Sequence, residues 1–355
     1  MKIHEKYIKR CLQLAENGLG RTFPNPMVGA VVVHKGRIIG EGWHRKAGEA
    51  HAEVHAINSV KDKSLLGKST IYVSLEPCSH YGKTPPCSDL IIASGIRKVV
   101  IGSVDPFAAV AGRGIKKLMD AGCMVSVGIL EKECRELNRR FFTFHQQQRP
   151  YIILKWAESL DGFISPKPLE ASERKPVWIT NQYSRQLVHK WRAEEQAILV
   201  GTNTAVSDDP GLGTRSWHGS DPVRLVLDRQ LRIPQASQLF DRKIRTIVIT
   251  DLKNLVPGNE ANLVFEKIDF DKDPAIQVAT ILYKHELQSV IIEGGRQTLQ
   301  TFIDSGLWDE ARIFRGNENL GAGTKAPKIS GRLVSETRLG ADTLKIYRND
   351  HDHNI

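Results

Sequence analysis

Short apolar runs alternate with stretches of helical periodicity along the first part of the chain. The start, MKIHEKYIKRCLQLAENG, carries apolar residues at helical spacing, and residues 28–33 and 36–42 predict a hairpin that turns at His34-Lys35-Gly36. The pattern then predicts helices and strands in alternation: a helix from about Ala52, a strand over 70–78, a helix over 88–95, a strand over 98–105, a helix over 112–121 and a strand over 124–130. Short buried strands separated by helices predict a three-layer α/β fold.

The second part of the chain repeats this alternation after a break. One charged helix is predicted over 130–148, and its final glutamine run ends at Pro150, where a strand begins. We therefore expect two domains, residues 1–147 and 148–355. The second domain is predicted to contain strands and one clear helix: strands over 151–157, 196–201, 223–228, 244–250 and 289–295, and the helix over 181–195.

Length, cysteine content and charge narrow the class of protein. A chain of 355 residues favours two domains over one. No apolar run approaches a membrane span and the start lacks a signal-peptide core, so the sequence predicts a soluble, cytoplasmic protein with no membrane partner. Five cysteines, an odd number, argue against a disulfide framework. The net charge of +10 fits a nucleic-acid partner, phosphorylated small molecules or no specific partner, and its spread along the chain does not choose among these.

The first candidate for chemistry is EPCSHYGKTPPC, in which eight residues separate Cys78 from Cys87. Upstream, EAHAEVHA places His51 and Glu53 at the start of a predicted helix, where both side chains can converge on an ion beyond the helix end. Catalytic zinc typically takes three nitrogen or sulfur ligands and leaves the fourth position to water, and His51, Cys78 and Cys87 supply such a set. Cys87 also opens a predicted helix, whose N–H groups favour a thiolate.

Glu53, two residues from the predicted ligand His51, is the candidate for proton transfer. Zinc deaminases combine a His-x-Glu element with a Pro-Cys element, and their glutamate is not a ligand. The chemistry predicted here is attack of zinc-bound hydroxide on an amidine-like ring carbon. Glu53 would take the water proton and return protons until ammonia leaves.

Each of these residues has a simpler interpretation when taken alone. A single His-x-Glu is usually a solvated helix face, and a cysteine after a strand is usually a small core residue. Their combination favours a zinc site. A structural zinc would normally take a fourth protein ligand, which His44, His55 or His80 could provide.

The stretches PNPMVGAVVV, HAEVHA and LEPCSHYGKTPPC resemble the deaminase half of the bifunctional riboflavin biosynthesis enzymes, the diaminohydroxyphosphoribosylaminopyrimidine deaminase/reductases. Nucleoside and nucleic-acid deaminases usually place two residues between their cysteines. The spacing of eight residues found here resembles that of the riboflavin-type family instead. The resemblance implies that Asn25, His44 and the loop 80–84 line the pyrimidine and its ribose phosphate. By itself, Asn25 reads as a turn residue before proline.

The second half is similar to the same family in KWAESLDGFIS, VWITN, GTNTAVSDDP, RLVLD and IIEGGRQTLQ. This resemblance implies a dihydrofolate-reductase-like fold that binds NADPH and reduces the opened ribose at C1 to a ribityl chain. It places three sets of residues: Ala157, Trp178, Thr204, Asp208, Gly294 and Gly295 around the dinucleotide, Arg192, Leu212, Arg215 and Glu293 around the substrate, and Lys155 and Asp161 as polar groups near the reacting carbon. Without the resemblance, the Gly-Gly turn at a helix start is only a weak phosphate signal, and Lys155 and Asp161 read as strand-end and turn residues.

Three positions depart from the family pattern. DPFAAV stands where relatives have DPNP, and Pro176 stands where relatives often have a serine that contacts the substrate. GLGTR replaces the commoner LT-x-R, so we expect Gly213 to make that loop more flexible. None of these changes touches the predicted zinc ligands or Glu53.

Three hypotheses follow. The first is a bifunctional enzyme that deaminates 2,5-diamino-6-(5-phosphoribosylamino)pyrimidin-4-one and then reduces its ribosyl chain, with zinc and NADPH as cofactors, no nucleic-acid partner, and a dimeric or tetrameric state implied by the resemblance. The second is a zinc-dependent nucleoside or nucleic-acid deaminase with an inactive reductase-like domain. The third is a zinc-stabilised scaffold, against which Glu53 argues because a structural site has no need of that carboxylate. GNENLGAGTK lacks the Lys-[ST] of a phosphate loop, so a nucleotide-triphosphatase is excluded.

Overall fold

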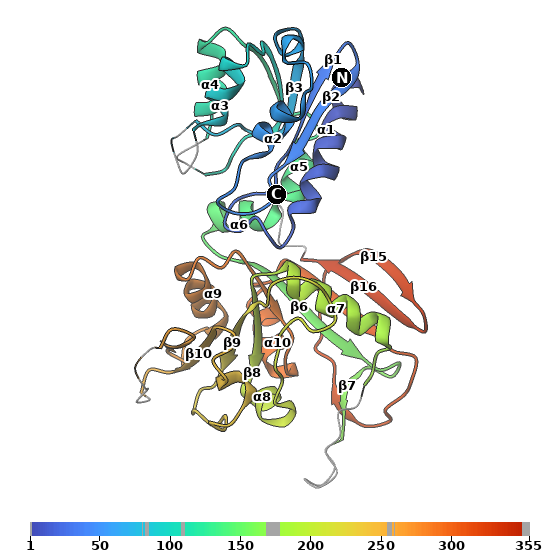
Figure 1. Ribbon diagram of the computed structural model, residues 1–355. Helices are drawn as coiled ribbons and strands as arrows, with labels where there is room; N and C mark the ends of the chain where they lie inside the picture. Colours follow the sequence, from blue (N-terminus) through green and yellow to red (C-terminus); the bar gives the residue numbers. More distant parts are fainter. Residues whose placement is uncertain are drawn as a thin grey trace. The chain divides into compact units, whose positions relative to one another are not determined.

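A computed structural model describes residues 2–79, 81, 85–107, 111–167, 178–253, 258 and 260–349. These residues form two compact units, and the division falls between Gln148 and Arg149 (Figure 1). None of the helices in these ranges combines the length and the apolar character that a membrane span requires.

The first unit is a five-stranded mixed sheet between two layers of helices. Its strands are β1 (Gly29–His34), β2 (Arg37–Trp43), β3 (Thr70–Leu75), β4 (Lys98–Ser103) and β5 (Met124–Val127). Its helices are α1 (Lys2–Ala15), α2 (Ala52–Ser59), α3 (Cys87–Ala93), α4 (Arg113–Asp120), α5 (Glu131–Leu137) and α6 (Arg139–Gln147), with short 3-10 turns η1 (Glu16–Gly18) and η2 (Lys63–Lys68). The order across the sheet is β2-β1-β3-β4-β5, in which β1 is antiparallel to both neighbours and β3, β4 and β5 are parallel.

Alternation along the strands separates two apolar layers in this unit. Ala30 and Val32 of β1 pack with α2, α3 and α4, whereas Val31 and Val33 pack with α1 and α5 on the opposite face. The predicted hairpin is confirmed. Lys35 and Gly36 both have positive φ, as a tight two-residue turn between right-twisted strands requires. The predicted three-layer α/β arrangement is confirmed as well.

The single helix predicted over 130–148 is wrong, because the structure has α5 and α6 with a break at Asn138. The buried Asn138 amide accepts the Met27 N–H at 2.8 Å and donates to the Met27 carbonyl at 2.8 Å. This pair of hydrogen bonds fixes Asn138 outside helical geometry, at φ −97° and ψ 22°. The partner is 111 residues away in the sequence, so local periodicity carries no sign of the break.

The second unit is built on a nine-stranded sheet. Its strands are β6 (Tyr151–Glu158), β8 (Ala197–Gly201), β9 (Val223–Leu227), β10 (Thr246–Asp251), β11 (Leu263–Ile268), β12 (Ser289–Ile292), β13 (Glu310–Arg315), β15 (Arg332–Leu339) and β16 (Asp342–Arg348), and a separate pair is formed by β7 (Phe163–Pro166) and β14 (Gly323–Lys325). Its helices are α7 (Gln182–Glu194), α8 (Thr202–Asp208), α9 (Pro274–Lys284) and α10 (Arg296–Asp304), with the 3-10 turn η4 (Gln238–Phe240).

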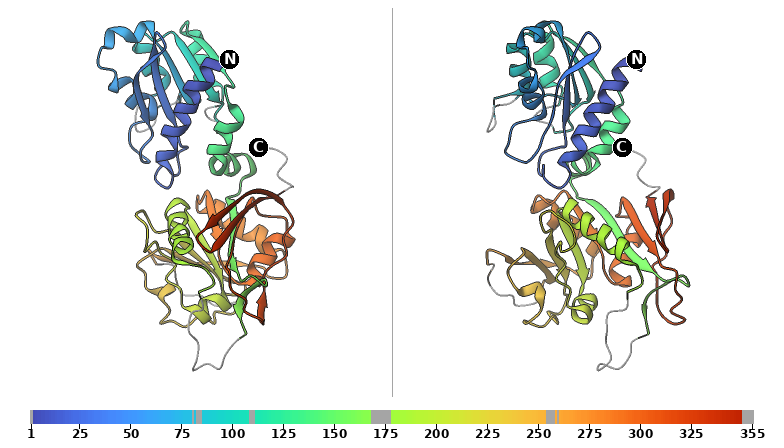
Figure 2. Two further views of the ribbon diagram at one scale, coloured as in Figure 1. Left: turned by 90° about the vertical axis from the view of Figure 1, so that its right-hand side faces the viewer. Right: turned by 45° about the vertical axis from the view of Figure 1, so that its right-hand side comes forward.

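This sheet has the order β11-β10-β9-β8-β12-β6-β13-β16-β15, and it is parallel from β11 to β13. One face packs against α9 and α10, and the other packs against α7 and α8 (Figures 1 and 2). Coverage of both faces explains why the central strands read as continuous apolar runs instead of alternating ones. The fold agrees with the predicted reductase class.

The chain changes direction across the sheet at β12. It steps outward from β8 through β9 and β10 to β11, and then returns so that β12 lies between β8 and β6. In register, Ile292 of β12 lies beside Leu154 of β6 and Leu199 of β8. The residues that follow these positions therefore meet at one edge, and such a switch point is where open α/β sheets bind ligands.

Candidate functional sites

The predicted zinc ligands come together in the first unit. His51 is the N-cap of α2, Cys78 follows β3, and Cys87 is the first residue of α3. His51 Nδ1 lies 3.6 Å from Cys78 Sγ and 3.4 Å from Cys87 Sγ, and the three ligand atoms lie within 4.8 Å of one another. One imidazole nitrogen and two thiolates at this spacing fit a zinc ion with an open position. Within the described ranges, this is the one such group of three or more residues.

Two of the three histidines that could provide a fourth zinc ligand lie within the described residues. His44 has both ring nitrogens in hydrogen bonds, to Asn25 Nδ2 at 3.1 Å and to the Ala50 carbonyl at 3.2 Å, so it is not available to a metal. His55 is outside the three-membered group, and its Nε2 is buried without a hydrogen-bond partner among the described residues. His80 lies outside the described residues.

The two thiols differ in electrostatic environment. The Cys87 backbone N–H, at the start of α3, donates to Cys78 Sγ at 3.3 Å. Hydrogen bonds from Cys87 and from His51 lower the pKa of the Cys78 thiol to about 4, against the effect of burial. The pKa of Cys87 is raised by its hydrogen bond to Cys78 and by burial. The N-terminus of α3 was expected to favour a thiolate at Cys87. In the structure its N–H group donates to Cys78 instead.

Glu53 lies at the second position of α2 and is only 3% exposed. Burial raises the pKa of its carboxyl to about 7, the negative Cys78 adds to this rise, and His51 opposes it. A carboxyl with a pKa near neutral both accepts and returns a proton readily.

Asn25 and His44 lie beside the ligand cluster. The His44 ring meets the His51 ring edge-on at 5.3 Å between centroids, and burial lowers the pKa of His44. Since Nε2 accepts from Asn25 and Nδ1 faces a carbonyl, the ring proton belongs on Nδ1. Of the predicted loop 80–84, only Tyr81 is within the described residues, and its side chain is 77% exposed.

Glu76 was not singled out from the sequence, although it is a charged residue at the end of an apolar strand. It is 4% exposed, and its two carboxylate oxygens accept four backbone N–H groups: those of Gly114 (2.9 Å), Ile115 (3.2 Å), Gly112 (2.9 Å) and Asp105 (3.3 Å). The carboxylate of Glu76 therefore holds Asp105 and the residues 112–115 against the chain that runs from β3 to Cys78.

Of the DPFAAV stretch that departs from the family pattern, the structure describes residues 105–107. Phe107 lies 5.1 Å from the His145 ring of α6, and its N–H donates to Asp105 Oδ1 at 2.8 Å. Burial raises the pKa of Asp105 to about 6. Residues 108–110 lie outside the described residues.

In the second unit, Lys155, Arg192 and Glu293 form one ion cluster at the switch point. Arg192 donates to both Glu293 oxygens, at 3.0 and 2.8 Å, and Lys155 Nζ lies 3.6 Å from Glu293 Oε2. Burial would raise the pKa of Glu293, but the positive charges of Arg192 and Lys155 outweigh it and lower the pKa to about 2. Burial lowers the pKa of Lys155, which Glu293 opposes. Glu293, which the resemblance places around the substrate, and Lys155, which it places near the reacting carbon, are thus in contact.

The Gly294–Gly295 turn links β12 to α10 and packs against α8. A Cβ at Gly294 would meet the Thr204 Cγ2 at 3.3 Å, and Gly295 has a φ of 51° with Thr204 Oγ1 at 3.2 Å from its would-be Cβ. Only glycine suits this close approach with left-handed backbone. Asp208 ends α8, and burial raises its pKa.

Three further residues predicted for the reductase site are Ala157, Trp178 and Asp161. Ala157 lies on β6 beside Phe314 of β13, and Trp178 is 63% exposed with the Arg185 guanidinium 4.7 Å from its ring. Asp161 accepts from Ser159 Oγ at 2.5 Å and from the N–H groups of Leu320 and Gly321 at 3.1 and 2.7 Å. These bonds make Asp161 a turn residue that anchors the segment 320–321.

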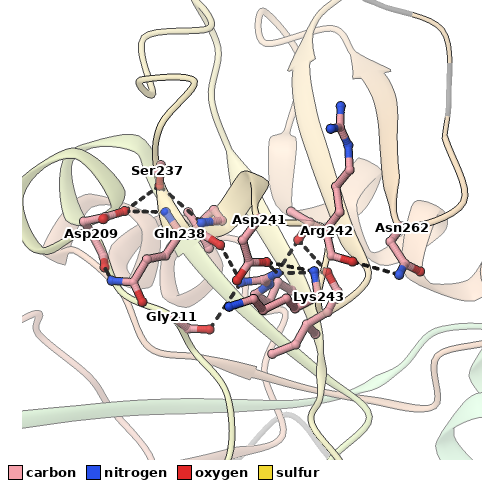
Figure 3. A network of polar contacts seen from close by, with 12 residues as sticks. Asp209, Gly211, Ser237, Gln238, Asp241, Arg242, Lys243 and Asn262 are labelled. Atoms are coloured by element: carbon pink, nitrogen blue, oxygen red, sulfur yellow. Dashed lines mark hydrogen bonds and ion pairs between the residues drawn. The ribbon is translucent and has the colours of Figure 1, made fainter.

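The segment 209–215, which carries Leu212 and Arg215, is tied down at its start. Asp209 accepts from Ser237 Oγ at 2.6 Å and from the Gln238 N–H at 2.9 Å, and Gln238 Nε2 donates back to the Asp209 carbonyl at 2.7 Å (Figure 3). The fully buried Arg224 donates to the Gln238 carbonyl at 2.8 Å and to Asp241 at 2.6 Å. This network fixes the backbone that presents the buried Leu212 and the exposed Arg215.

Gly213 is closely packed, and the flexibility expected of its loop stays a prediction. A Cβ at Gly213 would lie 2.9 Å from Asp221 Oδ1 and 3.1 Å from Ile244 Cδ1, and the Gly213 carbonyl accepts from Arg192 Nη1 at 3.2 Å. Glycine is present because the chain packs closely there. Pro176 lies outside the described residues.

Comparison with known proteins covers both units. The model of the RibD C-terminal domain matches residues 150–350, and that of the cytidine and deoxycytidylate deaminase zinc-binding region matches residues 1–103. The chain is 40% identical over 349 residues to riboflavin biosynthesis protein RibD of Aquifex aeolicus (strain VF5), covering 95% of this chain and 93% of that protein. It is 39% identical over 333 residues to RibD of Bacillus amyloliquefaciens, covering 92% and 88%.

Solved structures agree with these relatives. The crystal structure of a diaminohydroxyphosphoribosylaminopyrimidine deaminase/5-amino-6-(5-phosphoribosylamino)uracil reductase from Thermotoga maritima superposes with a TM-score of 0.86 at 35% identity, covering 98% of this chain and 99% of that chain. A structure of Acinetobacter baumannii RibD superposes with a TM-score of 0.85 at 32% identity, over 98% and 99% of the two chains.

Proposed function

This chain belongs to the RibD family of riboflavin biosynthesis proteins, and we propose that it catalyses two successive reactions with zinc and NADPH as cofactors. The first unit removes an amino group from 2,5-diamino-6-(5-phosphoribosylamino)pyrimidin-4-one by hydrolysis. The second unit reduces the ribosyl chain of the product to a ribityl chain. The observation that carries the proposal is the convergence of His51, Cys78 and Cys87 beside a buried Glu53.

In the deaminase unit, His51, Cys78 and Cys87 would hold the zinc ion, which when bound supplies an activated water. Glu53 accepts a proton from that water and delivers a proton to the departing amino nitrogen, so that one water is consumed and one ammonia is released. The pKa of about 7 at Glu53 suits both transfers. Asn25 and His44 hold the pyrimidine next to the metal ligands, which is supported by the contact between the His44 and His51 rings.

In the reductase unit, NADPH supplies the hydride, and the chain supplies position and charge. The Gly294–Gly295 turn and α8 offer close-approach backbone and the Thr204 hydroxyl to the dinucleotide. Lys155 and Glu293 stand at the switch point, where they balance charge at the reacting end of the ribose. The exposed Arg215 suits the substrate phosphate.

We also propose a homo-oligomer, a dimer or tetramer, working in the cytoplasm. The five cysteines are all free, which suits a reducing compartment. Light scattering coupled to gel filtration tests the oligomeric state, and a purely monomeric mass would contradict that part of the proposal.

The decisive experiment supplies the zinc-loaded protein with the diaminopyrimidinone phosphoribosylamine and follows ammonia release and NADPH absorbance together. Ammonia release that precedes NADPH oxidation supports both reactions and their order. Ammonia without NADPH oxidation would contradict the reductase assignment. No ammonia from this substrate, together with ammonia from nucleosides or single-stranded nucleic acid, would favour a nucleoside or nucleic-acid deaminase instead.

A further inference from the structure

His189 lies on α7, one turn before Arg192, and is 9% exposed. Its Nδ1 accepts the backbone N–H of Arg215 at 3.2 Å. An accepting Nδ1 carries no proton, so the neutral ring must hold its proton on Nε2. A buried histidine with this contact is a specific acceptor for one backbone group of the segment 209–215.

The end of this segment is held residue by residue. The Gly213 carbonyl accepts from Arg192, the Thr214 N–H donates to Asp221 Oδ1 at 2.6 Å, and the Arg215 N–H donates to His189. The Arg215 side chain is itself exposed, and its guanidinium forms no ion pair with any described residue. The backbone of Arg215 is therefore fixed while its charge stays available to a ligand.

We propose that His189 is a positioning residue for the substrate's phosphate: by binding the Arg215 N–H it directs the Arg215 guanidinium toward the phosphate of the pyrimidine substrate. The inference rests on the proposed reductase function, in which Arg215 binds that phosphate. It assigns His189 an effect on substrate recognition and none on hydride transfer.

Protonation of His189 would oppose this role, because an N–H at Nδ1 would face the Arg215 N–H. The charged groups that surround the ring are Arg192 on the same helix, Arg215 on the bound segment, and Glu293 after β12. Burial lowers the pKa of His189 and the two arginines lower it further, whereas Glu293 and a hydrogen bond with the Gly213 backbone oppose them. The acceptor is therefore kept at neutral pH and lost in acid.

The test compares His189→Leu, which removes the acceptor, with His189→Asn, whose side-chain oxygen takes nearly the place of Nδ1. His218→Leu serves as the matched control, because His218 is an exposed histidine of the same unit. Each variant is assayed by NADPH oxidation with the deaminated phosphoribosylamine and with the same compound lacking its phosphate. The deaminase rate and the melting temperature report on the integrity of the protein.

We expect His189→Leu to raise KM for the phosphorylated substrate roughly tenfold, because about one charge-assisted contact between Arg215 and the phosphate is lost. KM for the dephosphorylated substrate, KM for NADPH and kcat should stay within about twofold of the wild type, which is the precision of such a comparison. His189→Asn should recover most of the affinity, and His218→Leu should match the wild type. In an Arg215→Ala background, His189→Leu should have no further effect.

Equal losses with both substrates, or an additive loss in the Arg215→Ala background, would overturn the proposal by showing that His189 acts without Arg215. If His189→Leu does not fold, the pH profile decides. KM of the wild type should rise in acid more steeply than KM of His189→Asn. The titration of the substrate phosphate affects both proteins equally, so it does not cause the difference. Parallel profiles would overturn the proposal. A wild-type protein that oxidises NADPH with neither substrate would instead refute the proposed function.

Discussion

Glu53 combines deep burial with a position next to the metal ligand His51. Glu53→Gln keeps the size of the side chain but cannot exchange a proton. We expect ammonia release to fall by roughly two to four orders of magnitude, while bound zinc and NADPH oxidation with the deaminated substrate stay unchanged. Ammonia assays and metal analysis check this.

Glu49→Gln is the control for Glu53, since Glu49 is an exposed carboxylate just before α2. It should keep the wild-type rate of ammonia release. Loss of NADPH oxidation in a folded Glu53→Gln protein would contradict the separation of the two activities.

Glu293 should make the second unit sensitive to acid. Its pKa is lowered to about 2 in the folded protein, so its ionised form stabilises the fold above the ordinary glutamate pKa of about 4.5. That contribution, about 3 kcal/mol, is lost as the pH falls from there toward 2. The free energy of unfolding, measured by denaturant titration at several pH values, should fall more steeply for the wild type than for Glu293→Gln. Equal slopes would show that the ion cluster does not stabilise the fold.

At the level of elements, side chains from distant parts of the sequence determine where helices and loops stand. Asn138 divides α5 from α6 by binding Met27, and Arg224 holds the segment 209–215 through Gln238. Both residues are buried and polar. Asn138 bonds to the Met27 backbone, and Arg224 donates to backbone carbonyls and to the Asp241 carboxylate. Buried polar groups of this kind specify a geometry because leaving them unpaired is costly.

Glu76 is the strongest case in the first unit, because one carboxylate accepts four N–H groups from the start of α4 and the segment before it. Glu76→Gln puts an amide NH₂ against two of those donors. We expect it to lower the free energy of unfolding of the first unit by about 3 kcal/mol, and to reduce ammonia release because the segment lies next to Cys78.

The exposed Glu133 of α5 supplies the control, and Glu133→Gln should change stability by less than about 0.5 kcal/mol. Denaturant titration of the zinc-loaded proteins measures both values. A stable Glu76→Gln protein with normal ammonia release would show that Asp105 and the residues 112–115 are held by their other contacts.

At the level of the whole molecule, the candidate metal ligands all precede Gln148, and the Lys155–Arg192–Glu293 cluster follows it. Removing zinc with a chelator should therefore abolish ammonia release and leave NADPH oxidation with the deaminated substrate unchanged. Adding zinc back should restore ammonia release. Parallel loss of both activities on chelation would mean that the two sites depend on each other.

The alternation of apolar and polar positions was enough to predict most strands, the hairpin at Lys35-Gly36 and the first helix of the second unit, α7, because burial imposes those periods locally. Residue spacing was enough to indicate His51, Glu53, Cys78 and Cys87, because metal ligation requires particular residue types next to particular element ends.

Tertiary structure alone decided the division at Asn138, the anchoring role of Glu76, the close packing at Gly213 and the contact of His189 with Arg215. Each depends on a partner brought near by the fold from 26 to 111 positions away, or, for Gly213, on side chains that close in around the backbone. The reason is physical: periodicity reports which face of an element is buried, whereas a hydrogen bond or a steric contact depends on which atoms the packed elements bring together.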